Sequence, residues 1–299
     1  MAQTFDRIAV VGRFSDPRAS DCLSLLLPFL AQRKVDILLS PDSGIDPGDV
    51  AVEFLDDESL FAAADLIMAV GGDGTMLDAT RRAAGHGRPL LGINRGRLGF
   101  LADISPDDML ERLDEILGGS FEKEDRIMLH ASKHGADGPA ASGLALNDIA
   151  LQRWDTGRML DFETLIDGRY VNSHGGDGLV IATPTGSTAY ALSCGGPIIQ
   201  PDVDAVVLAP ICPHTLSDRP LVVGVNVEIC VRVLPRPDTR AQVGCDGQLL
   251  CELVPGEELR IRVADQRVTL IHPDGYDYYR ILRSKLHWGR GSFDRGSQS

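Results

Sequence analysis

The sequence is poor in positive charge. It contains 29 Lys and Arg residues against 43 Asp and Glu residues, which gives a formal net charge of −14 at pH 7. An acidic chain without a dense basic block is a poor candidate for binding nucleic acid or an anionic membrane. If such a protein holds polyphosphates, backbone amides, a few Arg side chains and Mg²⁺ must supply the positive field. We therefore expect no nucleic-acid partner and no membrane partner.

Paired cysteines are also lacking. The six cysteines of the 299-residue chain are scattered and form no C-x-x-C pair, so we expect reduced thiols and not a disulfide framework or a zinc site. No apolar stretch reaches the roughly 18–20 residues of a transmembrane helix. The first residues lack the basic and apolar regions of a signal peptide. These absences predict a soluble, cytoplasmic protein.

Common nucleotide and metalloprotease motifs are absent as well. The sequence contains no G-x-x-x-x-G-K-[ST] loop, no G-x-G-x-x-G after a predicted strand and no H-E-x-x-H. None of these signatures competes with the motifs described below. With 43% apolar residues, the chain can form the packed cores of one large or two ordinary domains.

The first 120 residues alternate between strand-like and helix-like segments. Strands are expected at 8–12, 35–39, 65–70 and 89–93, and helices at 17–34, 76–84 and 106–117. This alternation predicts an α/β Rossmann-like domain with a parallel sheet. Ligands of such a sheet bind at the C-terminal ends of its strands.

Residues 121–273 show a different pattern of short alternating segments separated by turns. Strands are expected at 127–133, 144–152, 161–166, 179–182, 206–208, 227–234, 259–263 and 268–271. This pattern predicts an all-β domain, a β-sandwich. The last segment, 274–299, is expected to form a helix over 276–288 that returns to the first domain, followed by a polar tail.

The most informative motif is Gly71-Gly72-Asp73-Gly74-Thr75, which lies between the apolar run 66–70 and a predicted helix. A buried strand that leads into a Gly-rich turn and a helix N-terminus presents backbone N–H groups to a phosphate. The acid in the middle of this turn, Asp73, suggests phosphoryl transfer to an alcohol. The local sequence leaves one alternative open, a structural turn in which the Asp caps the helix.

A second segment, 176–190, repeats this chemistry. Asp177 stands between two glycines and precedes an apolar strand and a loop of small hydroxyl residues. Small residues let a base or a ribose approach the backbone closely, and Ser187, Thr188 and Ser193 can form hydrogen bonds without adding bulk. A hairpin followed by a structural helix cap would give the same pattern.

Together these segments resemble the bacterial NAD kinase (ATP-NAD kinase) family over nearly the full length of the chain. The matching pieces are 71–75, 94–100, 176–196, 213–220, 245–248, 271–273 and 285–288. The GGDGT turn is shared with 6-phosphofructokinases and diacylglycerol-type lipid kinases, whereas the stretch 183–190 separates NAD kinases from both. The alternatives are a lipid kinase of the diacylglycerol or sphingosine type and a non-catalytic nucleotide sensor.

The resemblance implies transfer of the γ-phosphoryl group of ATP, bound with Mg²⁺, to the 2′-hydroxyl of the adenosine ribose of NAD⁺. Asp73 is the expected general base, and Gly72 and Gly74 are expected to hold phosphate oxygens through their N–H groups. The other expected substrate contacts, all of them in a dinucleotide-binding domain over 121–273, are Asn147, Asp148, Arg158, Asp177, Thr188, Ala189, Tyr190, Ala191, Leu192, Ser193 and Gln248. No residue is assigned as a metal ligand. A homo-oligomer, dimer or tetramer, is expected from the family.

The sequence departs from the family pattern at two positions. Asp148 stands where the family usually has Glu after the Asn, and it is one methylene shorter. Gly175 stands where many Gram-negative members carry an Arg that is associated with a preference for NAD⁺ over NADH. Gly175 therefore predicts that NADH is phosphorylated as well.

Overall fold

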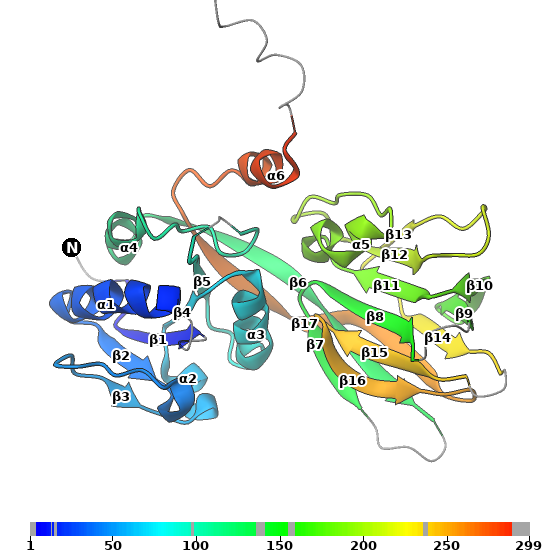
Figure 1. The fold of residues 1–299 in the computed structure, drawn as a ribbon, viewed down its shortest axis with the longest axis horizontal. Helices are drawn as coiled ribbons and strands as arrows, with labels where there is room; N and C mark the ends of the chain where they lie inside the picture. Colours follow the sequence, from blue (N-terminus) through cyan, green and yellow to red (C-terminus); the bar gives the residue numbers. More distant parts are fainter. Residues whose placement is uncertain are drawn as a thin grey trace, which may run out of the picture. The chain divides into compact units, whose positions relative to one another are not determined.

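The structure is a computed structural model that describes residues 4–12, 14, 17–96, 99–135, 141–154, 159–235 and 239–288. Contacts between residues divide the chain into two compact units (Figure 1). Unit 1 comprises Met1–Glu124 and Val268–Ser299, and unit 2 comprises Asp125–Arg267. The chain enters unit 2 within strand β6 (Phe121–His134) and leaves it within strand β17 (Glu258–Pro273).

Unit 1 contains a parallel sheet. Its strands are, in order, the end of β17, then β5 (Leu90–Ile93), β4 (Leu66–Val70), β1 (Arg7–Gly12), β2 (Asp36–Leu39) and β3 (Glu53–Phe54), and each neighbouring pair is parallel. The C-terminal ends of β4 and β5 therefore meet at the same edge of the sheet. Because the end of β17 pairs with β5, the chain is already back in unit 1 before the predicted C-terminal segment 274–299 begins.

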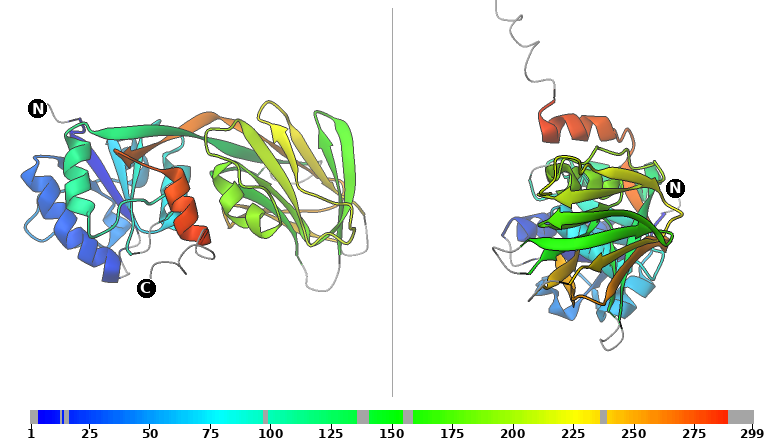
Figure 2. Two further views of the ribbon diagram at one scale, coloured as in Figure 1. Left: turned by 90° about the horizontal axis from the view of Figure 1, so that it is seen from above. Right: turned by 90° about the vertical axis from the view of Figure 1, so that its right-hand side faces the viewer.

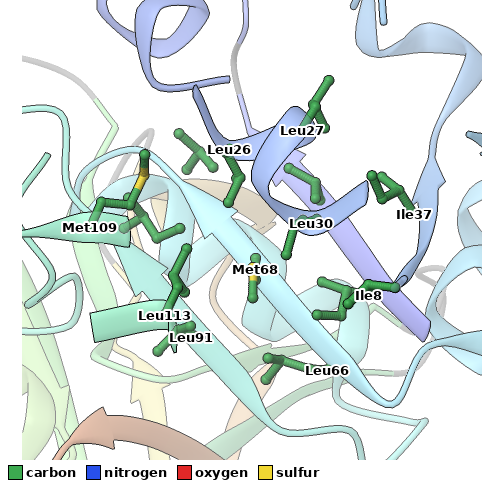
Figure 3. Close-up of a cluster of buried hydrophobic side chains, with 14 of the residues drawn as sticks. Ile8, Leu26, Leu27, Leu30, Ile37, Leu66, Met68, Leu91, Met109 and Leu113 are labelled. Atoms are coloured by element: carbon green, nitrogen blue, oxygen red, sulfur yellow. The ribbon is translucent and has the colours of Figure 1, made fainter. Parts of the chain in front are cut away.

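Helices cover both faces of this sheet (Figures 1 and 2). The helices α1 (Pro17–Gln32) and α4 (Met109–Leu117) share one face, where Leu30 and Leu113 pack with Met68 of β4 in one buried cluster (Figure 3). The helices α2 (Asp57–Ala63) and α3 (Asp73–Ala83) contact β1 on the other face. Right-handed crossovers require this arrangement, because the chain moves along the sheet in opposite directions at α1 and at α3.

Unit 2 is an antiparallel β-sandwich, as predicted. One layer is a six-stranded sheet in the order β13 (Leu221–Gly224), β12 (Ala205–Ile211), β11 (Gly178–Ala182), β8 (Asp148–Arg153), β15 (Ala241–Cys245) and β16 (Gln248–Leu253). The other layer contains β10 (Arg169–Gly176), β9 (Leu160–Ile166), β14 (Ile229–Val233), the first part of β17, β6 and β7 (Ser142–Ala145). Buried residues of both layers form one core.

Strand β11 is buried on both faces. Leu179 and Ile181 point into the core of the sandwich, whereas Val180 and Ala182 join a second buried cluster that includes Ala191. This second cluster is covered by the 3₁₀ turn Thr185–Thr188 and by helix α5 (Tyr190–Ser193). The segment 183–196 is thereby fixed on the outer face of the six-stranded sheet.

The last element is helix α6 (Tyr278–Leu286) in unit 1, which begins where Asp277 Oδ1 accepts the N–H of Tyr279 at 2.9 Å. Within the part of the chain that the structure describes, no helix combines the length and the apolar character needed to cross a membrane.

Candidate active site

Asp73 is the first residue of α3, directly after β4 and the turn Gly71-Gly72. Gly72 is the N-cap residue, with an extended backbone at φ −92° and ψ −171°. The N–H of Gly71 donates to the carbonyl of Ile93 at 2.8 Å, which joins the turn to the end of β5. A Cβ at Gly71 would overlap Thr75 Oγ1. The turn therefore requires Gly at this position.

The outer side of the turn is open. A Cβ built on Gly72 or Gly74 would meet no atom of the described residues within 4 Å. The first N–H groups of any helix have no acceptor within that helix, and the helix dipole adds a positive field at the same end. The N-terminus of α3 can therefore hold the oxygens of a phosphate.

The carboxylate of Asp73 is oriented by the loop that follows β5. Its Oδ2 accepts the N–H of Phe100 at 3.0 Å, and its Oδ1 accepts those of Leu101 at 3.0 Å and Ala102 at 3.3 Å. At Gly99 a Cβ would overlap Asp73 Oδ1. Because a carboxylate offers about four lone-pair sites, three N–H donors leave capacity for one more donor, such as a hydroxyl.

In unit 2, one carboxylate accepts hydrogen bonds from three consecutive backbone N–H groups. Asp246 accepts those of Leu146 at 3.0 Å, Asn147 at 2.8 Å and Asp148 at 3.1 Å. Burial, and then the nearby charge of Asp246, raises the pKa of Asp148 to about 7. A buried acid that changes its charge near neutral pH is typical of functional sites.

The loop after β11 packs directly on this group. Thr183 Oγ1 donates to the carbonyl of Leu146 at 2.5 Å and accepts the N–H of Gly186 at 3.1 Å. At Gly186 a Cβ would overlap the carbonyl oxygen of Asn147, so only Gly fits. Ser187 is fully buried, and its hydroxyl donates to the carbonyl of Pro184 at 2.6 Å, so it stabilises the loop and does not face a ligand.

A second polar group lies at the opposite end of β8 and β11. Asp177 Oδ1 lies 3.0 Å from Arg153 Nε, and the hydroxyl of Tyr190 accepts a hydrogen bond from Gln152 Nε2 at 3.0 Å. In the sheet, Gln152 is paired with Gly178 and Asp148 with Ala182. The two polar groups of unit 2 therefore flank the length of β11.

The predicted site residues are divided between the two units. The turn with Asp73 belongs to unit 1, and all other expected contacts that the structure describes belong to unit 2. Ser193 and Gln248 are exposed, whereas Ala191 is fully buried and packs in the second cluster. Arg158 lies outside the described residues.

Three residues of the site, Gln152, Arg153 and Asp246, were not predicted from the sequence. For Asp246 the sequence contains a signal, because an Asp-Gly pair is typical of a turn, and in the structure Asp246 and Gly247 have positive φ angles of 48° and 77°. No local pattern distinguishes Gln152 and Arg153, which approach Tyr190 and Asp177 only through the register of the sheet. The described residues include no group of three His, Cys, Asp or Glu side chains that could hold a metal ion.

Comparison with known proteins identifies the family. A family model described as the ATP-NAD kinase N-terminal domain matches residues 50–121, and one described as the ATP-NAD kinase C-terminal domain matches residues 146–273. The NAD kinase of Teredinibacter turnerae is 43% identical over 286 residues, which cover 96% of this chain and 98% of that protein. The chain belongs to the NAD kinase family. The NAD kinase of Azotobacter vinelandii is likewise 43% identical, over 288 residues that cover 95% of this chain and 97% of that protein.

Solved structures agree with this assignment. An NAD kinase from Archaeoglobus fulgidus in complex with ATP has a TM-score of 0.72 at 28% identity, and the match covers 94% of this chain and 98% of that one. Yeast NADH kinase complexed with NADH shows the same fold, with a TM-score of 0.87 at 23% identity over 95% of this chain and 88% of that one. The predicted family, fold class and NAD kinase activity are confirmed, and this function is favoured over a lipid kinase or a non-catalytic sensor.

Proposed function

We propose that Asp73 is the general base when the γ-phosphoryl group of ATP is transferred to the 2′-hydroxyl of the adenosine ribose of NAD⁺. The observation that carries this proposal is the Asp73 carboxylate itself, held by three backbone N–H groups at the N-terminus of α3. A ribose hydroxyl is a weak nucleophile at neutral pH, and a positioned base typically contributes roughly 10²–10⁴-fold. Alignment of donor and acceptor in a fixed site can supply a further ~7–11 kcal/mol.

ATP enters the reaction as its Mg²⁺ complex, so the ion is part of the substrate. The N–H groups of the turn around Gly72 and Gly74 would hold phosphate oxygens and stabilise the charge that develops during transfer. The open space over both glycines supports this role. A side chain at either position would occupy the place of the phosphate.

We assign the dinucleotide to unit 2. Asn147 and Asp148 would bind ribose or base edges, Asp177 would anchor an amide or a hydroxyl, and the ring of Tyr190 would stack on a base. The two polar groups flank a five-residue strand, which spans roughly 17 Å, so a ligand that contacts both has to be elongated. The remaining proposed contacts are Thr188, Ala189, Leu192, Ser193, Gln248 and Arg158.

The proposal is tested with purified protein, NAD⁺, MgATP and a coupled dehydrogenase specific for NADP⁺. Asp73→Asn should bind NAD⁺ and lose most turnover. Asp78→Asn is the matched control, because Asp78 lies on the same helix and its half-exposed carboxylate forms two long ion pairs, with Arg81 and Arg82, each at 3.4 Å. Near-normal turnover of Asp73→Asn would refute the base assignment.

We also propose that NADH is an acceptor. Gly175 lies at the end of β10, where a Cβ would meet Asp161 Oδ1 and Met159 Sδ at 3.2 Å. No side chain thus extends from this position, which is two residues before Asp177. Assays with NAD⁺ and NADH side by side test this proposal, and undetectable turnover of NADH would contradict it.

Three further expectations stay predictions. A homo-oligomer is tested by measuring the mass of the protein by light scattering as it elutes from a size-exclusion column. Mg²⁺ dependence is tested by measuring turnover while a chelator and then the metal are added. A cytoplasmic location is tested by cell fractionation.

A further inference from the structure

His272 is held between two carboxylates inside unit 1. Its Nδ1 lies 2.8 Å from Asp103 Oδ2, and its Nε2 lies 3.1 Å from Glu124 Oε2. The residue is only 1% exposed. The ring of Tyr276 stacks on the imidazole with 3.9 Å between the ring centroids. None of these four residues takes part in the function proposed above.

The geometry favours the imidazolium form of His272, because each ring nitrogen faces a carboxylate oxygen. Ionised carboxylates only accept hydrogen bonds, so both ring nitrogens have to donate, and the ring is an imidazolium. Burial works against this charge, but the hydrogen bonds to Asp103 and Glu124, together with their negative charge, outweigh it and raise the pKa of His272. The titratable groups that face the ring are Asp103 from the loop after β5, Glu124 from β6 and Tyr276 from the segment after β17.

Asp103 directly follows the loop that orients Asp73. On one side of it, the N–H of Ala102 donates to Asp73 Oδ1 at 3.3 Å. On the other side, Ile104 forms a parallel bridge with Ile93 of β5. The second oxygen of Asp103, Oδ1, is buried and accepts no hydrogen bond from the described residues. The imidazolium of His272 therefore compensates for a buried charge one residue away from a donor to Asp73.

We propose that His272 is a positioning residue for phosphoryl transfer: through Asp103 its imidazolium fixes the loop whose N–H groups orient the carboxylate of Asp73. This inference rests on the proposed role of Asp73. Without the imidazolium, the buried Asp103 carboxylate has to take up a proton or move towards water. Either change removes the ionic contact that anchors Asp103 and lets the adjacent N–H groups shift, and small displacements of a reacting group reduce the rate strongly.

The experiment compares His272→Gln with His86→Gln in the full-length protein. His86 is a matched control because it also lies in unit 1 and stacks on an aromatic ring, that of Phe61 at 6.2 Å. Two properties are measured: amide hydrogen exchange of residues 99–103 by mass spectrometry, and kcat and KM for NAD⁺ with MgATP between pH 6 and pH 9.5. Circular dichroism melts verify that each variant is folded.

For His272→Gln we expect hydrogen exchange of residues 99–103 to be at least about tenfold faster than in the wild type. We expect kcat to be at least about tenfold lower, and the KM for NAD⁺ to stay within about twofold of the wild type. Wild-type kcat should fall at alkaline pH as the imidazolium loses its proton, and this ionisation should be missing in His272→Gln. His86→Gln should match the wild type. Unchanged exchange, or a kcat within about twofold of the wild type, would overturn the proposal.

A double variant separates this inference from the role of Asp73. If His272 acts through Asp73, His272→Gln should lower kcat less than about twofold when Asp73→Asn is already present, and two fully multiplicative losses would overturn the proposal. If Asp73 is not the base, Asp73→Asn alone should have near-normal turnover. Hydrogen exchange in His272→Gln would still show whether His272 holds the loop 99–103. If His272→Gln does not fold, Asp103→Asn replaces it, and wild-type exchange and kcat in that variant would overturn the proposal.

Discussion

Asp246 accepts the N–H of Asp148 at 3.1 Å, while its charge adds to burial in raising the pKa of Asp148 to about 7. The same carboxylate thus stabilises the backbone at Asp148 and opposes ionisation of its side chain. An unfolded Asp loses its proton near pH 4, at about 3.9, whereas Asp148 in the folded protein keeps it until about pH 7. The folded state therefore binds more protons in this window, and its stability falls as the pH rises through it.

Asp148→Asn should remove the loss of stability that ionisation of the buried Asp148 carboxyl causes as the pH rises. We expect the free energy of unfolding of the variant, relative to the wild type, to grow by about 1.4 kcal/mol per pH unit between pH 5 and pH 7 and to level off above. Urea unfolding at pH 5, 6, 7 and 8 measures it, with Asp202→Asn, an exposed acid in the same unit, as the control. A difference that is constant over this range would contradict the account.

Asp246→Ala should destabilise unit 2. The substitution leaves the three N–H groups of residues 146–148 without their acceptor, and each such group costs about 1–3 kcal/mol when buried. Asp246→Asn should cost less, because Asn retains one acceptor oxygen and tolerates the positive φ of 48° at this position. Denaturant unfolding of both variants tests this order, and an Asn variant as unstable as the Ala variant would contradict it.

Gly92→Ala should impair turnover from a position outside the site. A Cβ at Gly92 would lie 2.6 Å from the carbonyl oxygen of Leu101 and 2.7 Å from the Cα of Ala102, so the loop that orients Asp73 has to move. We expect a loss of stability of about 1–3 kcal/mol and a lower kcat. Gly85→Ala is the control, because its Cβ would meet no described atom within 4 Å. Equal kcat values for the two variants would count against the role of this loop.

Gly175→Arg should lower the ratio of kcat/KM for NADH to kcat/KM for NAD⁺. The new side chain would displace the flexible end of Met159, and the resemblance to family members that carry an Arg at this position implies a shift in preference towards NAD⁺. Gly175→Ala adds the Cβ without the charge and separates the two effects. A ratio that stays the same in Gly175→Arg would show that this position does not control acceptor choice.

The sequence predicted most elements of unit 1 because strongly apolar strands alternate there with amphipathic helices. The helix after the GGDGT turn begins at Asp73 and not at Met76 as predicted. The prediction was late because Gly74, in the first turn of the helix, has a low helix propensity. Helix α2 was not predicted, although Asp56 caps it by accepting the N–H of Ser59 at 3.0 Å. The predicted domain boundaries follow residues 120 and 273, whereas the structure divides the chain after Glu124 and after Arg267. Both divisions lie inside strands that the two units share.

The β-rich unit was harder to predict in detail. The expected strand 144–152 is two strands, β7 and β8, because the N–H groups between them donate to the carboxylate of Asp246 and not to a neighbouring strand. The expected strands 259–263 and 268–271 are one continuous strand, β17, whose polar middle gave no apolar signal. Strands β10, β13, β15 and β16 were missed.

The candidate site was predictable where its residues lie in one segment. The turn around Asp73 and the segment 176–193 each form a local pattern in the sequence. Asp246, Arg153 and the pair of His272 with Asp103 were not assigned, because these contacts join residues about a hundred or more positions apart or depend on the register of the sheet. Sequence periodicity carries no information about such pairs.

Whether Asp73 takes the proton of the ribose 2′-hydroxyl is decided by measuring NADP⁺ formation from NAD⁺ and MgATP by the wild type and by Asp73→Asn. We predict that the wild type forms NADP⁺, and that the variant loses roughly 10²–10⁴-fold in kcat while its Kd for NAD⁺ stays within about threefold. A variant kcat within about tenfold of the wild type, at the same Kd, would contradict the claim.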